Sequence, residues 1–444
     1  MPVLQPLHIR TDPHSGRKYH ASTTLPANTD LLGSCGPYSY TIWKRFRNEV
    51  CAECWRYEGG RRTFLTLRDD EGLGGLMPNG DAQRSSTTAG LWFCDSRCQG
   101  EWVAREGVEA VDLLRQLEAA RKKTPSKPKL DAGGQQAADG EITQEVAERA
   151  WSAVRDKERS PKEVRKWRTL QLEDYETDMA RYVLLALYRR HREQYRNHST
   201  SRKDSTPGPQ SEEPTPTTDD EPSEWKTFAS LQANELQLLN ACPQILQHQT
   251  RIYQLLKGLL GSRAAERSNG SSRSSSVAAE PQPRADNART REVDDSACGC
   301  EEPHLADLVT IANVRTILSV DPGNAFGIWE VPLMEESECL GFALYPVPSF
   351  FNHRESTLSV RDARQPRLIF MVTADCAANV RKEREGRALR FVTTHAVNAG
   401  EELCISYGHV ETMDWATRQK ELLEGWYFEC RCGRCTAEAG GSAR

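Results

Sequence analysis

The spacing of its cysteines constrains this chain more than any other feature. Fourteen cysteines are present, and most of them fall in closely spaced groups. Cys51 and Cys54 form a CxxC pair, and Cys94 and Cys98 form a CxxxC pair. Fourteen cysteines in 444 residues are too few for a disulfide scaffold, so the pairs favour metal ligation. Two such pairs can converge around one tetrahedral Zn²⁺, although four unligated core thiols are the alternative.

A second cysteine group lies near the C-terminus. Cys430, Cys432 and Cys435 form a CxCxxC motif. Three ligands do not close a tetrahedral structural site, so a fourth must come from elsewhere in the chain. The alternative is a cysteine-rich tail without metal. Cys298 and Cys300 form an isolated CxC, to which we assign no role.

Composition excludes several classes of function. The chain has 58 Lys and Arg against 63 Asp and Glu, a net charge of −5, which argues against nucleic-acid binding by bulk charge. With a mean hydropathy of −0.66, it has apolar material for one or two cores beside polar stretches. No apolar run is long enough to span a bilayer, and residues 1–10 lack a secretory pattern. We therefore expect a reducing compartment, nucleus or cytoplasm or both.

The pattern along the chain predicts helices between polar segments. Residues 69–90, 198–224 and 261–296 are polar and are expected to be surface loops or linkers, the last two disordered. Apolar residues recur at helical spacing over 142–154, 182–188 and 238–260, and the last stripe fits one or two helices with Pro243 in a first turn. Core packing explains these stripes.

The C-terminal third has a different, β-type pattern. Short β-type runs cover 358–360, 368–372, 389–393 and 403–407, with a charged loop expected over 381–387. A helical pattern follows over 415–423. The sequence therefore predicts an α+β plan with β-structure at both ends and helices in the middle.

Four segments together resemble the SET–MYND type of SET-domain lysine methyltransferases, especially the fungal branch. The segments are SGRKYHA from residue 15 with LPANT from residue 25; the paired cysteines with WFC from residue 92, Cys98-Gln99 and Trp102; NAFG from residue 324 with SFFNH from residue 349; and GEELCISY from residue 400, followed by WYFEC from residue 426. They cover residues 8–105 and 305–435, in the order found in that family.

The resemblance implies a SET-domain β-fold with a threaded, knot-like arrangement. Its parts would be N-terminal SET strands (8–50), a MYND-like zinc finger with a long polar loop (51–105), a helical insert (106–300), the SET core (301–411) and a post-SET segment (412–444). The zinc sites would be structural and would take no part in the chemistry.

The implied activity is S-adenosylmethionine-dependent methyl transfer to a lysine of a protein, with histones as a family-level guess. Tyr407 would be the catalytic residue and would also contact the cofactor. Further cofactor contacts would come from Asn324, Ser349, Asn352, His353 and Phe428. We expect a monomeric chromatin regulator that binds a protein substrate but neither membrane nor nucleic acid directly.

Three departures from the family pattern keep a second hypothesis open. Lys18 stands where a second glycine would let the backbone approach the cofactor. Glu355 stands where a cysteine would complete the C-terminal zinc site, although a carboxylate can also ligate Zn²⁺. The finger keeps one ligand set instead of two, which predicts one zinc there, one to two per chain, and lost binding of proline-rich peptides. A catalytically weak or inactive scaffold that binds partners is therefore the alternative function.

Overall fold

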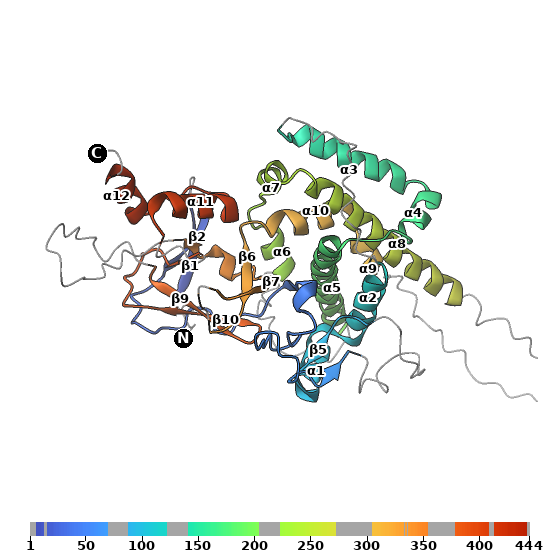
Figure 1. Cartoon of the computed structure of the whole chain (residues 1–444), viewed down its shortest axis with the longest axis horizontal. Coiled ribbons are helices and arrows are strands. Elements are labelled where there is room, and N and C mark those ends of the chain that lie inside the picture. The colour runs from blue at the N-terminus through green and yellow to red at the C-terminus, as the bar shows by residue number, and fades with distance from the viewer. Residues whose placement is uncertain are drawn as a thin grey trace, which may run out of the picture.

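The two ends of the chain build one β-region, and a long middle segment builds a helical region beside it (Figure 1). The computed structural model describes residues 6–12, 16–69, 88–121, 141–203, 223–271, 304–332, 334, 336–353, 378–407 and 413–441. The strands are β1 (Leu7–Asp12), β2 (Gly16–Ala21), β3 (Ser39–Ile42), β4 (Leu67–Arg68), β5 (Trp92–Phe93), β6 (Ala325–Trp329), β7 (Cys339–Leu344), β8 (Asn352–His353), β9 (Val380–Glu385), β10 (Ala388–Thr393) and β11 (Cys404–Ile405).

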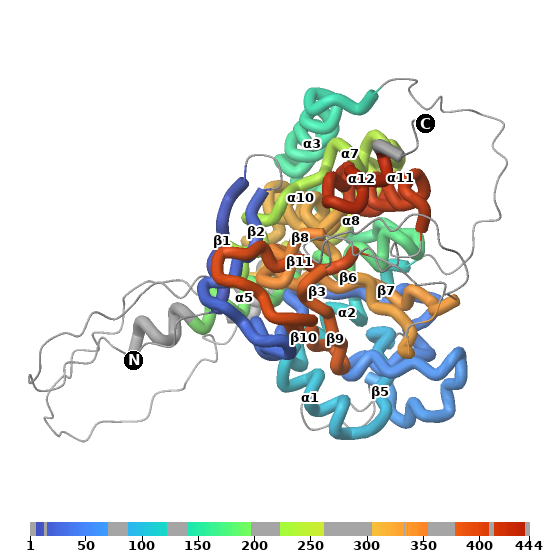
Figure 2. Tube along the Cα trace, turned by 90° about the vertical axis from the view of Figure 1, so that its left-hand side faces the viewer, coloured from blue at the N-terminus to red at the C-terminus, as the bar shows by residue number. Residues whose placement is uncertain are grey.

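The β-region joins strands that are hundreds of residues apart. Strand β3 pairs antiparallel with β7, which also pairs with β6. Isolated bridges connect His20 to Glu402, Leu25 to Val397 and Asp30 to Val392, so the N-terminal segment runs beside the C-terminal one. Figure 2 shows the N-terminal strands β1 and β2 next to the chain around β10 and β11. The expected joining of N-terminal strands to a C-terminal β-core is therefore observed.

The helical region and the C-terminal segment supply the remaining elements. They are α1 (Ser96–Glu106), α2 (Val108–Ala119), α3 (Gln144–Glu158), α4 (Pro161–Trp167), α5 (Asp174–Lys203), α6 (Glu224–Ala229), α7 (Glu235–Ala241), α8 (Ile245–Ser271), α9 (Leu305–Leu308), α10 (Ile311–Val320), α11 (Trp415–Trp426) and α12 (Gly433–Gly441), with 3₁₀ turns η1 (Lys44–Phe46) and η2 (Pro348–Phe350). Among the described residues, no helix combines the length and the apolar character that a membrane span requires.

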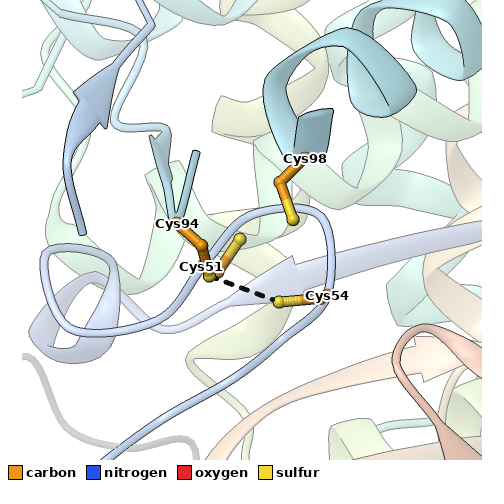
Figure 3. A group of neighbouring side chains, drawn as sticks. All are labelled: Cys51, Cys54, Cys94 and Cys98. Atoms are coloured by element: carbon orange, nitrogen blue, oxygen red, sulfur yellow. Dashed lines mark hydrogen bonds between the residues drawn. The ribbon is translucent and has the colours of Figure 1, made fainter. Parts of the chain in front are cut away.

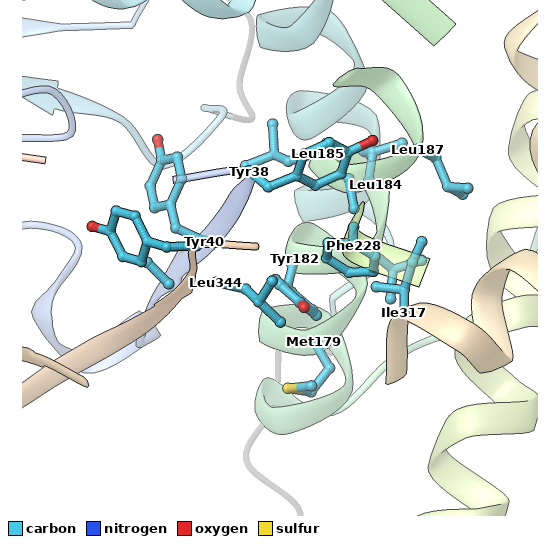
Figure 4. Packing of buried hydrophobic residues seen from close by; sticks show 14 of the residues in the cluster. Tyr38, Tyr40, Met179, Tyr182, Leu184, Leu185, Leu187, Phe228, Ile317 and Leu344 are labelled. Atoms are coloured by element: carbon cyan, nitrogen blue, oxygen red, sulfur yellow. The ribbon is translucent and has the colours of Figure 1, made fainter. Parts of the chain in front are cut away.

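Helix α5 is the centre of the main core. Its residues 179–188 are buried on all sides, which is the pattern of a helix surrounded by other elements. Tyr38 and Leu344 reach it from the β-region, whereas Phe228 and Ile317 reach it from α6 and α10 (Figure 4). The Ser39 hydroxyl donates to the Tyr182 carbonyl at 2.6 Å. This shared core fixes the β-region against the helices.

The predicted strand over 389–393 and helix over 415–423 are confirmed as β10 and α11, and the stripe over 238–260 forms two helices, α7 and α8. The charged loop expected over 381–387 was wrong. Most of it is strand β9, which forms a hairpin with β10 and turns at Gly386, where φ is 58°. The charged side chains lie along a partly exposed strand, which hydropathy does not reveal.

The structure leaves other expectations untested or changes their bounds. The predicted strands over 358–360 and 368–372 lie outside the described residues, as do Cys298 and Cys300 and most of the three polar segments. Helices α5 and α8 continue into the starts of two of those segments, to Lys203 and Ser271. The expected strand over 403–407 is reduced to the two residues of β11. The expected knot-like threading is not tested, because residues 354–377, which follow the Asn-His segment, lie outside the described part.

Candidate functional site

The four finger cysteines converge, as the sequence predicts. Their sulfur atoms all lie within 4.8 Å of one another (Figure 3). Cys51 and Cys54 lie in the turn after η1, Cys94 follows β5, and Cys98 lies in the first turn of α1. Asp95 caps that helix by accepting the backbone N–H of Cys98 at 2.9 Å, which orients the last thiol.

The electrostatics of this group fit a bound cation. A hydrogen bond from Cys54 lowers the pKa of Cys51 to about 5. Burial, and next the negative charge of Cys51, raise the pKa of the Cys94 thiol to about 11. A divalent cation would remove that repulsion and allow all four sulfurs to ionise. The arrangement can therefore hold one Zn²⁺.

The C-terminal cysteines also come together. The sulfurs of Cys430, Cys432 and Cys435 lie within 4.8 Å of one another. The guanidinium of Arg418, which is fully buried, donates to the Cys435 sulfur at 3.4 Å. Three thiols can supply three of the four ligands of a zinc site. The proposed fourth ligand, Glu355, lies outside the described residues.

Tyr407 and His353 are brought together by a short parallel pair of strands. Strand β8 pairs with β11, so Asn352 is opposite Cys404 and His353 is opposite Ile405. The backbone N–H of Tyr407 donates to His353 Nδ1 at 2.9 Å, and the Tyr407 hydroxyl donates to the Phe351 carbonyl at 2.7 Å. The two sequence motifs predicted to form one site are therefore adjacent in space.

Aromatic rings surround this pair. The centroid of the Tyr407 ring lies 5.3 Å from that of His353, 6.1 Å from that of Phe428 and 5.6 Å from that of Trp426. Burial raises the pKa of Tyr407, so its hydroxyl keeps its proton at neutral pH. Burial, with a smaller effect of Arg418, lowers the pKa of His353 to about 4, so the imidazole is neutral and its Nδ1 accepts. Neutral donors and acceptors between aromatic faces are suited to a cationic group.

Asn324 and Ser349 are adjacent to each other and are partly engaged within the protein. The Ser349 hydroxyl contacts the Asn324 carbonyl at 3.3 Å and donates to the Tyr345 carbonyl at 2.8 Å. The Asn324 side-chain amide donates to the carbonyls of Gln232 and Val320 at 2.8 and 2.7 Å. In this structure the amide of Asn324 therefore holds the turn between α10 and β6.

Lys18, the departure in the N-terminal motif, is neutralised by acids. Its ammonium lies 3.2 Å from Glu402 and 3.9 Å from Asp12. Glu402 belongs to the Gly-Glu-Glu-Leu segment that leads to Tyr407. The ion pair thus connects the first motif to the last one.

Two residues of this region were missed by the sequence analysis. Trp426 lies against Tyr407, and its place two residues before Phe428 in the same motif was a usable signal. Asn379 is buried; its side chain donates to the Glu402 carbonyl at 2.8 Å and accepts from the Cys404 N–H at 2.8 Å. Asn379 therefore fixes β11, and no motif in the sequence marks it.

The fold and these sites define a mixed α and β protein with two cysteine clusters and a split β-region that holds a tyrosine–histidine site. No family model matches the chain. It is 22% identical to the potential protein lysine methyltransferase SET6 of Saccharomyces cerevisiae over 445 aligned positions, which cover 97% of this chain and 95% of that protein. By these comparisons and those below, the chain is similar to SET-domain and SET and MYND domain proteins.

Two other relatives match over shorter regions. A SET and MYND domain-containing protein of Dictyostelium discoideum is 28% identical over 125 residues, which are 28% of this chain and 26% of the relative. The histone-lysine N-methyltransferase ASHR2 of Arabidopsis thaliana is 31% identical over 147 residues, 31% of each chain. The chain thus matches less than a third of the length of these two proteins.

Proposed function

We propose that this chain is an S-adenosylmethionine-dependent protein-lysine N-methyltransferase. The observation that carries the proposal is the convergence of Tyr407, His353 and Phe428, from three separate segments, on one aromatic site. The names of SET6 and ASHR2 support lysine methylation at a coarser level. Histones are the proposed substrates to test first, and nucleus or cytoplasm is the proposed location.

Each site residue has a proposed role that follows from its contacts. S-adenosylmethionine, when bound, supplies an electrophilic methyl group on a sulfonium. Phe428 and Trp426 would offer aromatic faces to the cation, and the carbonyl of Phe351 a partial negative charge. His353 holds the backbone of Tyr407. Asn352 in β8 and Ser349 just before that strand would orient the cofactor.

Tyr407 would orient the substrate amine. Its hydroxyl, held by the Phe351 carbonyl at 2.7 Å, keeps its proton because burial raises the pKa of the phenol. A lysine must lose its proton before its nitrogen can accept a methyl group, and burial beside the positively charged sulfonium would lower the pKa of the ammonium. The buried surroundings of Tyr407 would provide that desolvation.

The two cysteine clusters are proposed to be structural zinc sites. Cys51, Cys54, Cys94 and Cys98 would hold one ion, and the C-terminal cysteines with Glu355 would hold a second. Neither cluster includes Tyr407, so the metals would stabilise the fold around the site.

The decisive experiment compares Tyr407→Phe with Tyr195→Phe, a tyrosine that is 49% exposed on α5. Methyl transfer to histones and to lysine-containing peptide arrays is followed with labelled S-adenosylmethionine, and cofactor affinity by calorimetry. We expect Tyr407→Phe to lower kcat roughly 10²-fold, as for the loss of one positioned hydrogen-bond donor, and Tyr195→Phe to leave it unchanged. Equal rates in wild type and Tyr407→Phe contradict the assignment.

The same calorimetry tests the scaffold alternative, which the ion-paired Lys18 and the engaged amide of Asn324 favour. Absence of S-adenosylmethionine binding by a folded wild-type protein supports the scaffold function. Saturable binding without turnover on the arrays shows that the substrate class is wrong while the cofactor site stands.

A further inference from the structure

A cavity of about 320 Å³ lies between the helical region and the C-terminal segment. Its walls come from α5, α7, α8, the end of α10, strand β7 and the end of α11. Aromatic side chains share the lining with aliphatic ones; the aromatic residues are Trp43, Tyr175, Phe342, Trp426 and Tyr427. This volume is at the lower end of the range for ligand pockets in proteins, and it is ample for one side chain.

A single carboxyl group changes the chemistry of this aromatic cavity. Asp321 lines it directly after α10, and its Oδ1 atom is buried without a hydrogen-bond partner among the described residues. Burial raises the pKa of Asp321 well above its ordinary value. In the part of the chain that the structure describes, no lysine, arginine or histidine pairs with it. An acid so placed gains stability when a cation enters.

The surroundings of Asp321 favour a positive charge further. The carboxyl follows the C-terminal end of α10, where the partial charge of the helix is negative. Burial raises the pKa of Tyr175 and of Tyr427, and the nearby charge of Asp321 raises the pKa of both phenols further. His248 also lines the cavity, but its Nδ1 atom lies 2.9 Å from Glu176 Oε1, so this histidine already pairs with Glu176. The carboxyl group of Asp321 can therefore pair with a ligand.

The cavity adjoins the tyrosine site through one side chain. Trp426 lines the cavity, and the centroid of its ring is 5.6 Å from that of Tyr407. A polypeptide that presents a lysine to Tyr407 would therefore pass close to this cavity. Aromatic faces and a desolvated carboxylate together recognise an aliphatic chain that ends in a cation.

We propose that this cavity binds a second basic side chain, lysine or arginine, of the protein substrate, beside the lysine that is methylated. The inference rests on the proposed function for its substrate, but the cavity itself binds alkyl cations whether or not the chain turns over. A purely apolar occupant is disfavoured, because it would leave the Asp321 carboxyl buried without a partner. The substrate class is therefore proteins with clustered basic residues.

Binding of small probes to the full-length protein tests the cavity without catalysis. The probes are n-butylammonium, propylguanidinium and the uncharged 1-butanol, with affinity measured by NMR titration. We expect both cations to bind and 1-butanol to bind at least tenfold more weakly. Asp321→Asn should weaken cation binding at least tenfold, whereas Asp156→Asn, at an exposed surface pair with Arg159, should leave it unchanged.

A second variant guards against misfolding of the first. Leu238→Trp adds bulk to the cavity wall while it keeps the carboxyl, and it should also abolish cation binding. Urea unfolding identifies variants that remain folded. Equal affinity of the three probes for wild type, no binding of the cations to wild type, or unchanged cation binding in both folded cavity variants overturns the proposal.

Peptide kinetics then connect the cavity to the substrate. An array varies each position around a target lysine between arginine and glutamine. Basic neighbours should lower KM for wild type, and Asp321→Asn should remove that preference and leave kcat unchanged. A preference that survives in Asp321→Asn contradicts the substrate role. Cation binding without any methyl transfer instead contradicts the proposed enzyme and leaves the cavity intact.

Discussion

Arg387 is expected to fasten the β9–β10 hairpin to the cysteine finger. It follows Gly386 in the hairpin turn and is buried, and its guanidinium pairs with Glu53 at 3.3 Å and with Glu106. It also lies over the ring of Tyr40, 4.4 Å from the centroid. One side chain thus connects the hairpin, the finger and α1.

The cost of Arg387→Met can be worked out from these contacts. Removing one partner of a buried ion pair costs about 3–5 kcal/mol, because the other charge stays buried. Glu53 would still pair with Arg105 at 2.6 Å, so the cost of a buried, unpaired charge would fall mainly on Glu106. Methionine retains the apolar part of the packing but loses a cation–π contact of about 0.5–2 kcal/mol. We expect the free energy of unfolding to fall by about 4 kcal/mol, near the lower end of these contributions taken together.

Arg390→Met is the matched control in the same hairpin. Arg390 pairs with Asp30 at 2.6 Å, but the two side chains are 52% and 30% exposed, so the loss should be roughly 0–1 kcal/mol. Urea unfolding followed by tryptophan fluorescence measures both variants, and Trp55 lies close to Arg387. Adding Glu106→Gln to Arg387→Met should recover part of the loss. Equal losses in the two single variants would refute the reasoning.

Three further perturbations probe the helices, the finger and the buried charges. In α8, an added Cβ at Gly258 would lie 2.8 Å from backbone at the end of α4, so Gly258→Ala should lower the urea midpoint. An added Cβ at Gly261 would have nothing within 4 Å, so Gly261→Ala should raise the midpoint through its higher helix propensity. The opposite order of the two midpoints contradicts this packing. Cys51→Ser should lower the zinc content by one ion per chain in elemental analysis and destabilise the N-terminal third, whereas unchanged content removes the finger site. Burial alone would raise the pKa of Glu118, but Arg181 and neighbouring guanidiniums lower it to about 2, against about 4.5 in the unfolded chain. The stabilisation from ionised Glu118 is therefore complete above pH 4.5 and is lost as the pH falls towards 2. In Glu118→Gln, the urea midpoint should depend less on pH between 4.5 and 2 than in wild type.

Local patterns predicted what local chemistry decides. The two cysteine clusters follow from short spacings, which place thiols on one turn or on a strand and the helix after it. Helix α11 and strand β10 follow from periodicity. The meeting of His353 and Tyr407 came from the resemblance of two motifs, because no spacing rule relates residues so far apart.

Features that depend on remote packing were out of reach of the sequence. Strand β9 is charged and partly exposed, so its hydrogen-bonded partner β10, and not its hydropathy, makes it a strand. The role of Asn379 arises because buried backbone groups of Glu402 and Cys404 need partners. The cavity at Asp321 is formed by residues from Trp43 to Tyr427 that share no motif.

The way β11 is held explains why so much of the chain serves one tyrosine. Two residues of parallel pairing supply too few hydrogen bonds to fix a catalytic side chain by themselves. The strand is instead fixed by the amide of Asn379 from one side and, through the Leu403 N–H donated to the Tyr19 carbonyl at 2.9 Å, by strand β2 from the other. The N-terminal strands are therefore part of the site, although they carry no group that touches Tyr407 in the contacts described. A β-region split by a long helical segment can place the tyrosine accurately only when both ends of the chain are in place.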